Sequence, residues 1–149
     1  MQLQRLFQRF GNVFVGGILR SPLHAMLSKN ILLLTFNGRV SGRQYSTPVN
    51  YALIDEEIYI FSKKDRIWWR NLRGGAPVMF RLQGSAATGW GEAFEDESEV
   101  ERGLMEFLQA VPNFAKYYEV GLDEEGRLKR EDVAQAAKPW VLVKITRDE

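Results

Sequence analysis

The stretch YSTPVNYALIDEEIYIFS, residues 45–62, decides the fold. It holds two runs rich in β-branched and aromatic residues, Tyr45–Ile54 and Glu57–Ser62, on either side of the short acidic turn Asp55-Glu56. Two such runs separated by a two-residue turn are typical of a β-hairpin. The stretch therefore predicts two antiparallel strands that are joined at residues 55–56.

Further strands are predicted on both sides of this hairpin. Ile31–Phe36 is a compact apolar run, and Val78–Gln83 and Ala86–Phe94 form a second hairpin around a Gly-Ser turn. Trp140–Ile145 is a last strand that returns after a helical region. About six strands in antiparallel hairpins, without the strand–helix alternation of a parallel sheet, predict a β-barrel with peripheral helices, of the α+β class, rather than a doubly wound sheet.

Helical segments are predicted between these strands. Asp65 is placed to cap a short helix over Arg66–Arg73, because an aspartate oxygen accepts hydrogen bonds from the free amides of a first turn. Ser98 and Glu101 have the spacing of a capping box before an apolar-periodic helix. Shorter helical pieces are expected over Asn113–Val120 and at the end of the charged segment that follows.

The N-terminal segment has its own pattern. Residues 2–19 repeat apolar side chains every three to four positions, with basic and no acidic side chains on the other face, which predicts an amphipathic helix. A second short helix is expected over residues 21–27, because proline is tolerated in a first turn. The basic helix either packs on its own domain or makes a weak contact with an anionic membrane surface. We expect one domain over residues 1–149, with residues 1–28 as an N-terminal helical extension.

The composition excludes several kinds of site. The chain has no cysteine and a single histidine, His24, which excludes a disulfide framework, a thiolate nucleophile and a multi-histidine metal site. No apolar run approaches the roughly 20 residues that cross a bilayer. We therefore expect a cytoplasmic protein without a metal site, at most peripheral to a membrane.

Charge is distributed unevenly along the chain. Residues 1–91 hold 12 lysines and arginines against 4 acids, whereas residues 92–149 hold 8 against 15. The basic part contains the turn GRVSGR, residues 38–43, in which two glycines let backbone N–H groups converge between Arg39 and Arg43. The turn is a candidate cradle for a phosphate or carboxylate. An ordinary solvated turn between two strands has the same composition.

Aromatic residues supply the other candidates. Trp68-Trp69 lies among lysines and arginines, and such a pattern can stack on single-stranded nucleic acid. Trp69 is also spaced as the apolar anchor of a short helix, and we predict no nucleic-acid partner. The candidate proton donors are Tyr45, Tyr51, Tyr117 and Tyr118. The sequence contains no carboxylate pair, metal box or nucleophile–base pair, so any redox chemistry would depend on a bound cofactor.

Taken together, the motifs resemble one known family. GRVSGR at 38–43, TPVNY at 47–51, the acidic hairpin turn and WWRNL at 68–72 resemble the deazaflavin (coenzyme F-420)-dependent nitroreductase and quinone reductase family, within the FMN-binding split β-barrels related to pyridoxamine-phosphate oxidase. The resemblance covers residues 20–95 well and the C-terminal part loosely. It implies an FMN-binding-protein-like, six-stranded antiparallel split barrel. It also implies an oxidoreductase that binds deazaflavin or FMN and transfers hydride to a small acceptor such as a quinone or a nitro compound.

The resemblance also assigns residues to the site. Those implied to hold the cofactor are Arg39, Ser41, Gly42 and Arg43 at the phosphate, the backbone of Pro48, Val49 and Asn50 at the edge of the ring, and Lys63, Trp68 and Asn71 closing the groove. The substrate side would be lined by Phe114, Tyr117 and Tyr118, and the two tyrosines are the candidate catalytic residues.

Two positions of the turn depart from the family pattern. Val40 stands where a lysine is usual, and Tyr45 where an arginine is usual. The loss of two cations weakens the expectation of a polyglutamated deazaflavin tail, although Lys63, Lys64 and Arg66 could compensate. FMN, another flat anionic ligand and a non-catalytic barrel that binds a cofactor or a hydrophobic ligand therefore stay open, as does the choice between a homodimer and a monomer.

Overall fold

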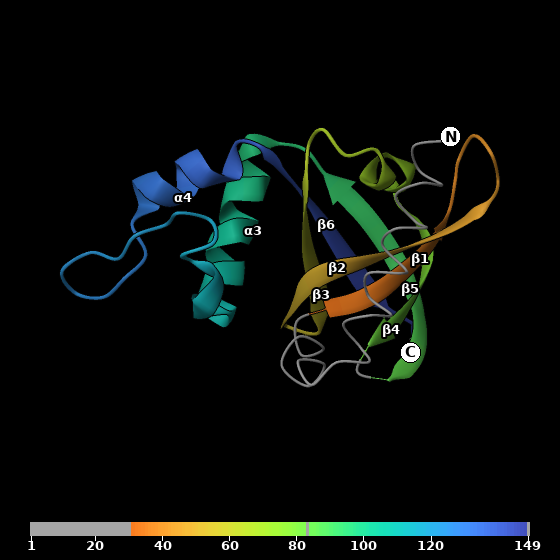
Figure 1. Ribbon diagram of the computed structural model, residues 1–149, viewed down its shortest axis with the longest axis horizontal. Coiled ribbons are helices and arrows are strands. Elements are labelled where there is room, and N and C mark those ends of the chain that lie inside the picture. The colour runs from red at the N-terminus through yellow and green to blue at the C-terminus, as the bar shows by residue number, and fades with distance from the viewer. Residues whose placement is uncertain (1–30, 83, 149) are drawn as a thin grey trace.

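Residues 31–82 and 84–148 are described in the computed structural model. The predicted N-terminal extension over residues 1–28, with its amphipathic segment 2–19, His24 and the predicted strand residue Gln83 lie outside the described residues. Within them, six strands form a closed barrel with helices on one side (Figure 1). This confirms the predicted antiparallel barrel with peripheral helices.

Every strand of the barrel pairs antiparallel with its neighbours, in the order β1-β2-β3-β6-β5-β4. The strands are β1 (Ile31–Asn37), β2 (Gln44–Ile54), β3 (Glu57–Lys63), β4 (Ala76–Leu82), β5 (Ser85–Phe94) and β6 (Trp140–Arg147). Both predicted hairpins form, and pairing of β1 with β4 closes the barrel.

The strand residues alternate between two hydrophobic cores. Ile58 and Ile60 of β3 are fully buried inside the barrel, together with Val143 of β6. Tyr59 of β3 and Leu142 of β6 point outward into a second core. Because side chains of a strand alternate between its faces, the same two strands supply both cores.

Two helices cover the outward faces of β3 and β6. They are α3 (Glu97–Ala110) and α4 (Arg130–Ala137), with a 3-10 turn, η2 (Pro112–Phe114), between them. Phe107 of α3 is 1% exposed and meets the ring of Phe61 edge-on, with the centroids 5.2 Å apart. The helical layer is thus fixed to the barrel through aromatic contacts.

Two predicted helix caps are wrong. α3 begins at Glu97, and the side chain of Asp96, not Ser98, accepts a hydrogen bond from the amide of Glu99 at 3.2 Å. Aspartate and serine are equally favourable N-cap residues. Asp96 precedes Ser98, and its negative charge also interacts favourably with the helix N-terminus, which explains why it is the cap. η1 (Trp68–Leu72) is a 3-10 helix that begins after Ile67, and no described side chain, Asp65 included, caps it.

The helix predicted over Asn113–Val120 is also wrong. Only Pro112–Phe114 forms a 3-10 helix. The chain then continues through hydrogen-bonded turns, in one of which the Tyr118 amide donates to the Phe114 carbonyl at 3.1 Å, to Glu119, whose φ of 59° is left-handed. A left-handed residue ends a helical path, because it reverses the direction of the chain.

Candidate functional site

The barrel opens between β2 and β3. These strands pair only from their hairpin to the pair Tyr51–Ile60. Beyond that pair, β2 is paired with β1 alone and β3 with β6 alone. The two strands therefore diverge from their hairpin, as Figure 1 shows. No described strand pairs with this edge of residues 44–50, so alternate residues turn their backbone hydrogen-bonding groups into the opening.

Residues that the family resemblance assigned to the cofactor lie on both sides of this opening. If the ladder continued past Tyr51–Ile60, it would set Pro48–Asn50 opposite Phe61–Lys63. Val49 packs against the inner core, whereas Asn50 is exposed. The predicted ring edge and the predicted closing residue Lys63 thus lie on neighbouring strands, in the stretch where these strands are not paired with each other.

The turn at residues 38–43 is tightly built and lies at the same end of the barrel. The amide of Gly38 donates to the carbonyl of Arg43 and the amide of Gly42 to the carbonyl of Gly38, both at 2.8 Å. Gly42 has a φ of 70°, which glycine adopts without strain. Ser41 Oγ accepts a hydrogen bond from the Arg43 amide at 3.2 Å. The backbone of the predicted cradle is therefore fixed before any ligand binds.

Tyr45 explains one departure from the family pattern. It is 3% exposed, its ring lies 6.1 Å from that of Phe36, and its hydroxyl lies 3.1 Å from Ser41 Oγ. A β-carbon on Gly38 would come within 2.7 Å of both Ser41 and the Tyr45 ring. Tyr45 therefore packs in the core and supports the turn from inside. The arginine that is usual at this position would instead offer its charge to a ligand. Val40, the other departure, is 93% exposed.

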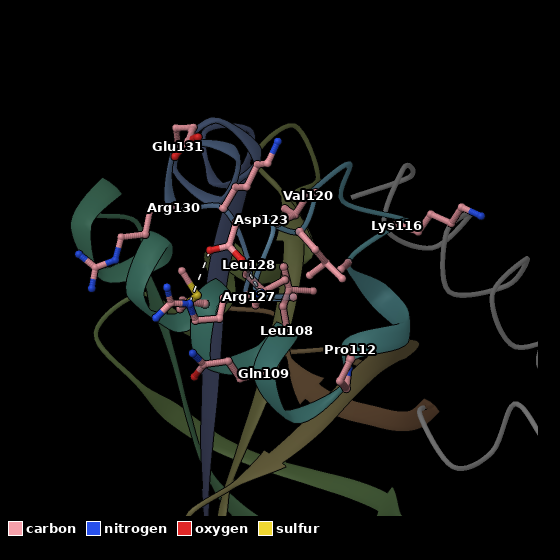
Figure 2. Close-up of a pocket in the computed structure, with 16 residues that line it drawn as sticks. Leu108, Gln109, Pro112, Lys116, Val120, Asp123, Arg127, Leu128, Arg130 and Glu131 are labelled. Atoms are coloured by element: carbon pink, nitrogen blue, oxygen red, sulfur yellow. Dashed lines mark hydrogen bonds and ion pairs between the residues drawn. The ribbon is translucent and has the colours of Figure 1, made fainter.

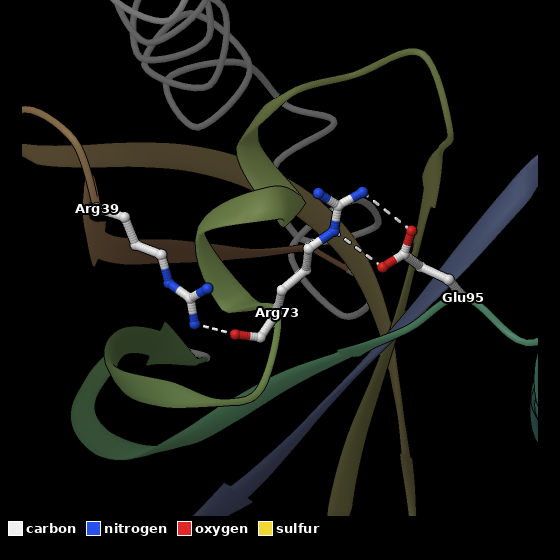
Figure 3. Close-up of polar contacts among 3 residues, drawn as sticks. All are labelled: Arg39, Arg73 and Glu95. Atoms are coloured by element: carbon white, nitrogen blue, oxygen red, sulfur yellow. Dashed lines mark hydrogen bonds and ion pairs between the residues drawn. The ribbon is translucent and has the colours of Figure 1, made fainter.

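η1 is tied to the turn by Asn71. Its Oδ1 accepts a hydrogen bond from the Arg39 amide at 3.0 Å, and its Nδ2 donates to the carbonyl of Trp68 at 2.9 Å. The Arg39 guanidinium donates to the carbonyl of Arg73 (Figure 3). Each end of the Asn71 amide thus makes one hydrogen bond within the protein, which fixes this side chain between the turn and η1. Its contact with a cofactor stays a prediction.

Arg73 is held in turn by Glu95. Two hydrogen bonds join the guanidinium to the carboxylate, at 2.9 and 3.1 Å (Figure 3). The carboxylate raises the pKa of Arg73 above its ordinary value. Arg73 is therefore committed to Glu95, whereas Arg43 is exposed and has no ion pair among residues 31–82 and 84–148.

The two tryptophans of η1 close this end of the barrel. Trp68 is 5% exposed and its ring lies 6.0 Å from that of Phe36, so it belongs to the inner core and offers little free face. Trp69, predicted as a core anchor, is 3% exposed. Its indole N–H is buried and has no acceptor in the described part of the chain. A buried donor without a partner is costly, so this N–H is a candidate contact for an acceptor atom of a ligand.

Lys63 and the two candidate tyrosines belong to one aromatic cluster. Lys63 is paired with Trp140 across β3 and β6, and its Nζ lies 4.9 Å from the centre of the Trp140 ring. That ring is 4.9 Å from the Tyr118 ring, which is 5.1 Å from the Tyr117 ring. Trp140 therefore joins residues that the sequence analysis treated separately. The signal for it was the strand register, which a single sequence does not contain.

The two tyrosines differ in access to solvent. Tyr117 is 65% exposed, whereas Tyr118 is 9% exposed, and burial raises the pKa of the Tyr118 hydroxyl. Tyr118 therefore gives up its proton less readily than an ordinary tyrosine, and Tyr117 is the better placed to meet a substrate. Phe114 stacks on Phe107 with the ring centres 5.6 Å apart, which makes it part of the outer core.

Two concavities lie away from these residues. One, of about 530 Å³, is on the outer face of β1, β4 and β5. The other, of about 1200 Å³, lies beside α3 and α4. No residue assigned to the cofactor lines either of them.

The described residues contain no group of histidine and acidic side chains that could hold a metal ion, and no helix among them is long and apolar enough to span a membrane.

Comparisons with known proteins support the fold. No protein-family model matches the chain, and no curated protein matches it. A conserved hypothetical protein from Mycobacterium tuberculosis has a similar structure, with a TM-score of 0.57 and 20% identity over 93% of this chain and 80% of that one.

Two further similar structures have a TM-score of 0.51 each. A general stress FMN/FAD binding protein from Xanthomonas citri is 19% identical over 84% of this chain and 80% of its own. An F420-H2 dependent reductase is 15% identical over 78% of this chain and 94% of its own. Identities this low show a shared fold and carry no function with them.

Proposed function

We propose that this chain is an oxidoreductase that binds a flavin-type nucleotide, FMN or deazaflavin, in the opening between β2 and β3. It would transfer hydride to a small acceptor such as a quinone or a nitro compound. The observation that carries the proposal is the divergence of the two strands. It leaves Pro48–Asn50 and Lys63 on opposite sides of one gap, at the end of the barrel where the 38–43 turn and η1 meet.

The turn and η1 would hold the anionic part of the ligand. Arg43 is exposed and free for bidentate contact with a phosphate, and Arg39 lies beside it with its backbone fixed by Asn71. Ser41 and Gly42 complete the same turn. Because these groups are fixed before binding, little conformational entropy is lost when an anion binds.

The strand edge would hold the planar part. Pro48 and Asn50 are the alternate residues that turn their backbone to the gap. The Pro48 carbonyl and the Asn50 N–H and carbonyl can bond the polar edge of a heterocycle, and Lys63 lies on the far side of the gap. The bound cofactor would supply the hydride chemistry, and the chain would orient it and shield it from water. Tyr117 is the exposed aromatic that can contact an acceptor, with Tyr118, Trp140 and Phe114 behind it.

The names of two similar structures support a flavin-type cofactor. One is named an FMN/FAD binding protein and another an F420-H2 dependent reductase, and they share this architecture. The replacement of a usual cation by the buried Tyr45 reduces the positive charge available to a polyanionic tail. That observation favours FMN over deazaflavin within the proposal.

Binding experiments test the proposal directly. The mass and the absorption spectrum of the protein as isolated would identify a retained yellow ligand, and fluorescence titrations with FMN and with coenzyme F-420 would give the two affinities. We expect Arg43→Glu to weaken binding at least about tenfold, because it replaces a charge-assisted contact with a repulsive one. Arg81→Glu, an exposed arginine on the outer face of β4, is the matched control and should bind as the parent does. Absence of binding to both cofactors would reject the proposal.

A non-catalytic barrel is the second candidate. Tyr118 is buried with a raised pKa, and Asn71 has both ends of its amide occupied, so two of the predicted site residues have structural roles. Stopped-flow oxidation of the reduced, cofactor-loaded protein by menadione or a nitroaromatic compound separates the two. Acceptor-dependent oxidation supports the reductase, and tight binding without it supports the binding protein.

Oligomeric state, location and membrane contact stay predictions. Sedimentation analysis distinguishes the predicted homodimer from a monomer. Liposome flotation with and without residues 2–19 tests the predicted weak contact with a membrane surface.

A further inference from the structure

A groove of about 1200 Å³ lies between α3, the segment that follows it and the start of α4 (Figure 2). Much of its lining is apolar and comes from three parts of the chain: Met105, Leu108, Ala115, Val120, Leu122 and Leu128. The groove shares no residue with the proposed cofactor site. What binds there is therefore a question independent of the proposed function.

One wall of the groove is rigid. The Asp123 carboxylate accepts hydrogen bonds from the amides of Glu125 and Arg127, each at 2.9 Å, and Leu122 and Leu128 form a β-bridge. The amide of Gly121 donates to Asp132 in α4 at 2.9 Å. The loop is thus held from both ends, and Leu122 is kept 57% exposed on the lining of the groove. An exposed apolar side chain on a fixed wall is a feature of a binding surface.

The rim of the groove is positively charged, although residues 92–149 are acidic as a whole. Lys116, Lys129 and Arg130 line it and take part in no ion pair within the described ranges. Arg127 also lines it, but pairs with Asp123 and with Glu125. Figure 2 shows Lys116 and Arg130 extending outward from opposite sides of the groove. The groove therefore combines apolar lining side chains with cations that have no acidic partner and extend from its sides.

The start of α4 adds to this positive potential. Lys129 stands at its N-cap, and no described side chain caps the first turn. The carboxylate of Asp132, in that first turn, is bonded to Gly121. Glu131 is the one lining acid of this helix and opposes the effect. Over the whole lining, the four basic residues Lys116, Arg127, Lys129 and Arg130 stand against the two acids Asp123 and Glu131, and this excess favours an anion.

We propose that the groove binds a small anionic amphiphile, a fatty-acid-like molecule. Its apolar chain lies along Met105, Leu122 and Leu128, which are at least partly exposed, and its carboxylate lies at the rim beside Lys129 and Arg130. A neutral chain would use only the floor, and a hydrophilic anion only the rim. The combination of an apolar floor with unpaired cations at the mouth selects a ligand that has both parts.

Calorimetric titrations of the protein with octanoate, decanoate and dodecanoate, below their micellar concentrations, test the proposal. Affinity should rise about fourfold per added methylene while the chain fits the floor, since this is the effect of burying one methylene. Amide chemical shifts should change in residues 105–131 and not around residues 38–50. Decanol should bind more weakly than decanoate.

Three variants separate the two parts of the site. Lys129→Glu combined with Arg130→Glu should weaken decanoate binding about tenfold and leave decanol binding unchanged. Lys138→Glu, at the other end of α4 and outside the groove, is the matched control and should change neither. Leu122→Gln should weaken both ligands to a similar extent, because its side chain is exposed and contributes to the floor.

Other results would overturn the proposal. These are no saturable binding at about 1 mM decanoate, chemical-shift changes centred on the barrel opening, or equal loss of binding in Lys138→Glu. Concentration-dependent dimerisation that Leu122→Gln abolishes would instead assign the groove to a second copy of the chain.

Discussion

The inner core of the barrel and the outer core beneath α3 are built on the same two strands but differ in what surrounds them. Inside, Ile60 and Val143 are fully buried among side chains of the other barrel strands. Outside, Phe61 and Leu142 meet the side chains of a helix. The outer core also has a polar margin, where the Tyr59 hydroxyl donates to Glu106 Oε2 at 2.8 Å. The inner core therefore defines the barrel, and the outer core is the part that can adjust.

The outer core can be broken at its centre. Phe107→Ala removes a ring that contacts Phe61, Phe114 and Tyr118. We expect the free energy of unfolding to fall by about 3–5 kcal/mol, the usual cost of deleting a buried phenyl group. Urea titration measures it. Met105→Ala, half-buried on the same helix, should cost clearly less, and equal losses in the two variants would mean that Phe107 is not the centre of this core.

Two glycines test whether the barrel is the more rigid region. A β-carbon on Gly89 of β5 would lie 2.5 Å from the backbone oxygen of Thr146, whereas one on Gly103 of α3 would lie 2.5 Å from Leu142 Cδ2, the end of a flexible side chain. We expect Gly89→Ala to cost about 1–3 kcal/mol. Gly103→Ala should be close to neutral, because alanine is about 1 kcal/mol better in a helix.

Thermal unfolding of these two variants gives the comparison. If Gly103→Ala lost as much stability as Gly89→Ala, the helical layer would be as rigid as the barrel.

Alkaline pH should weaken the outer core in particular. Burial, followed by the hydrogen bond to Glu106, raises the pKa of Tyr59, and burial raises that of Tyr118. Above pH ~10 the unfolded chain loses these protons while the folded chain keeps them, so stability is full below pH ~10 and falls as the pH rises. Each tyrosine contributes a slope of at most about 1.4 kcal/mol per pH unit.

Urea midpoints between pH 9 and 11 measure this slope. Tyr59→Phe should reduce it and should also cost about 1 kcal/mol at neutral pH, where the hydrogen bond to Glu106 is lost. An unchanged slope in this variant would show that Tyr59 does not titrate differently in the two states.

The start of α3 gives the smallest effect. Asp96→Ala should cost about 1 kcal/mol, because its carboxylate caps the first turn. Ser98→Ala should be nearly neutral, since Ser98 lies inside the first turn and not at its cap. The reverse order would restore the capping box predicted from the sequence.

The strands could be predicted because their signals are local. The two-residue turn at Asp55-Glu56 and the alternation of Val78 and Phe80 with Met79 are visible in one short stretch each, and both hairpins form. The first residue of each helix was harder to predict. Asp96 and Ser98 are equally good N-cap residues, and the sequence does not show which of the two caps α3. The expected helix over 113–120 failed for a similar reason, because its aromatic spacing also suits a chain of turns packed on Phe107.

The site could be predicted only in part. The 38–43 turn is contiguous in sequence, so its residues were certain to lie together. The pairing of Lys63 with Trp140 and the separation of β2 from β3 depend on strand register over long sequence distances. The structural role of Tyr45 was not predicted either. Its position in the sequence is the same whether the side chain points into the barrel or toward solvent.

Pro48 gives the gap between β2 and β3 a second consequence. A bare strand edge invites a foreign strand, which leads to aggregation. Proline cannot donate a backbone hydrogen bond, and within a sheet it is tolerated where its nitrogen faces away from the ladder. Since β1 is paired along this stretch, that nitrogen faces the gap. Pro48 thus interrupts the row of backbone donors that a foreign strand would need along this edge, and Pro48→Val should make the protein more prone to self-association.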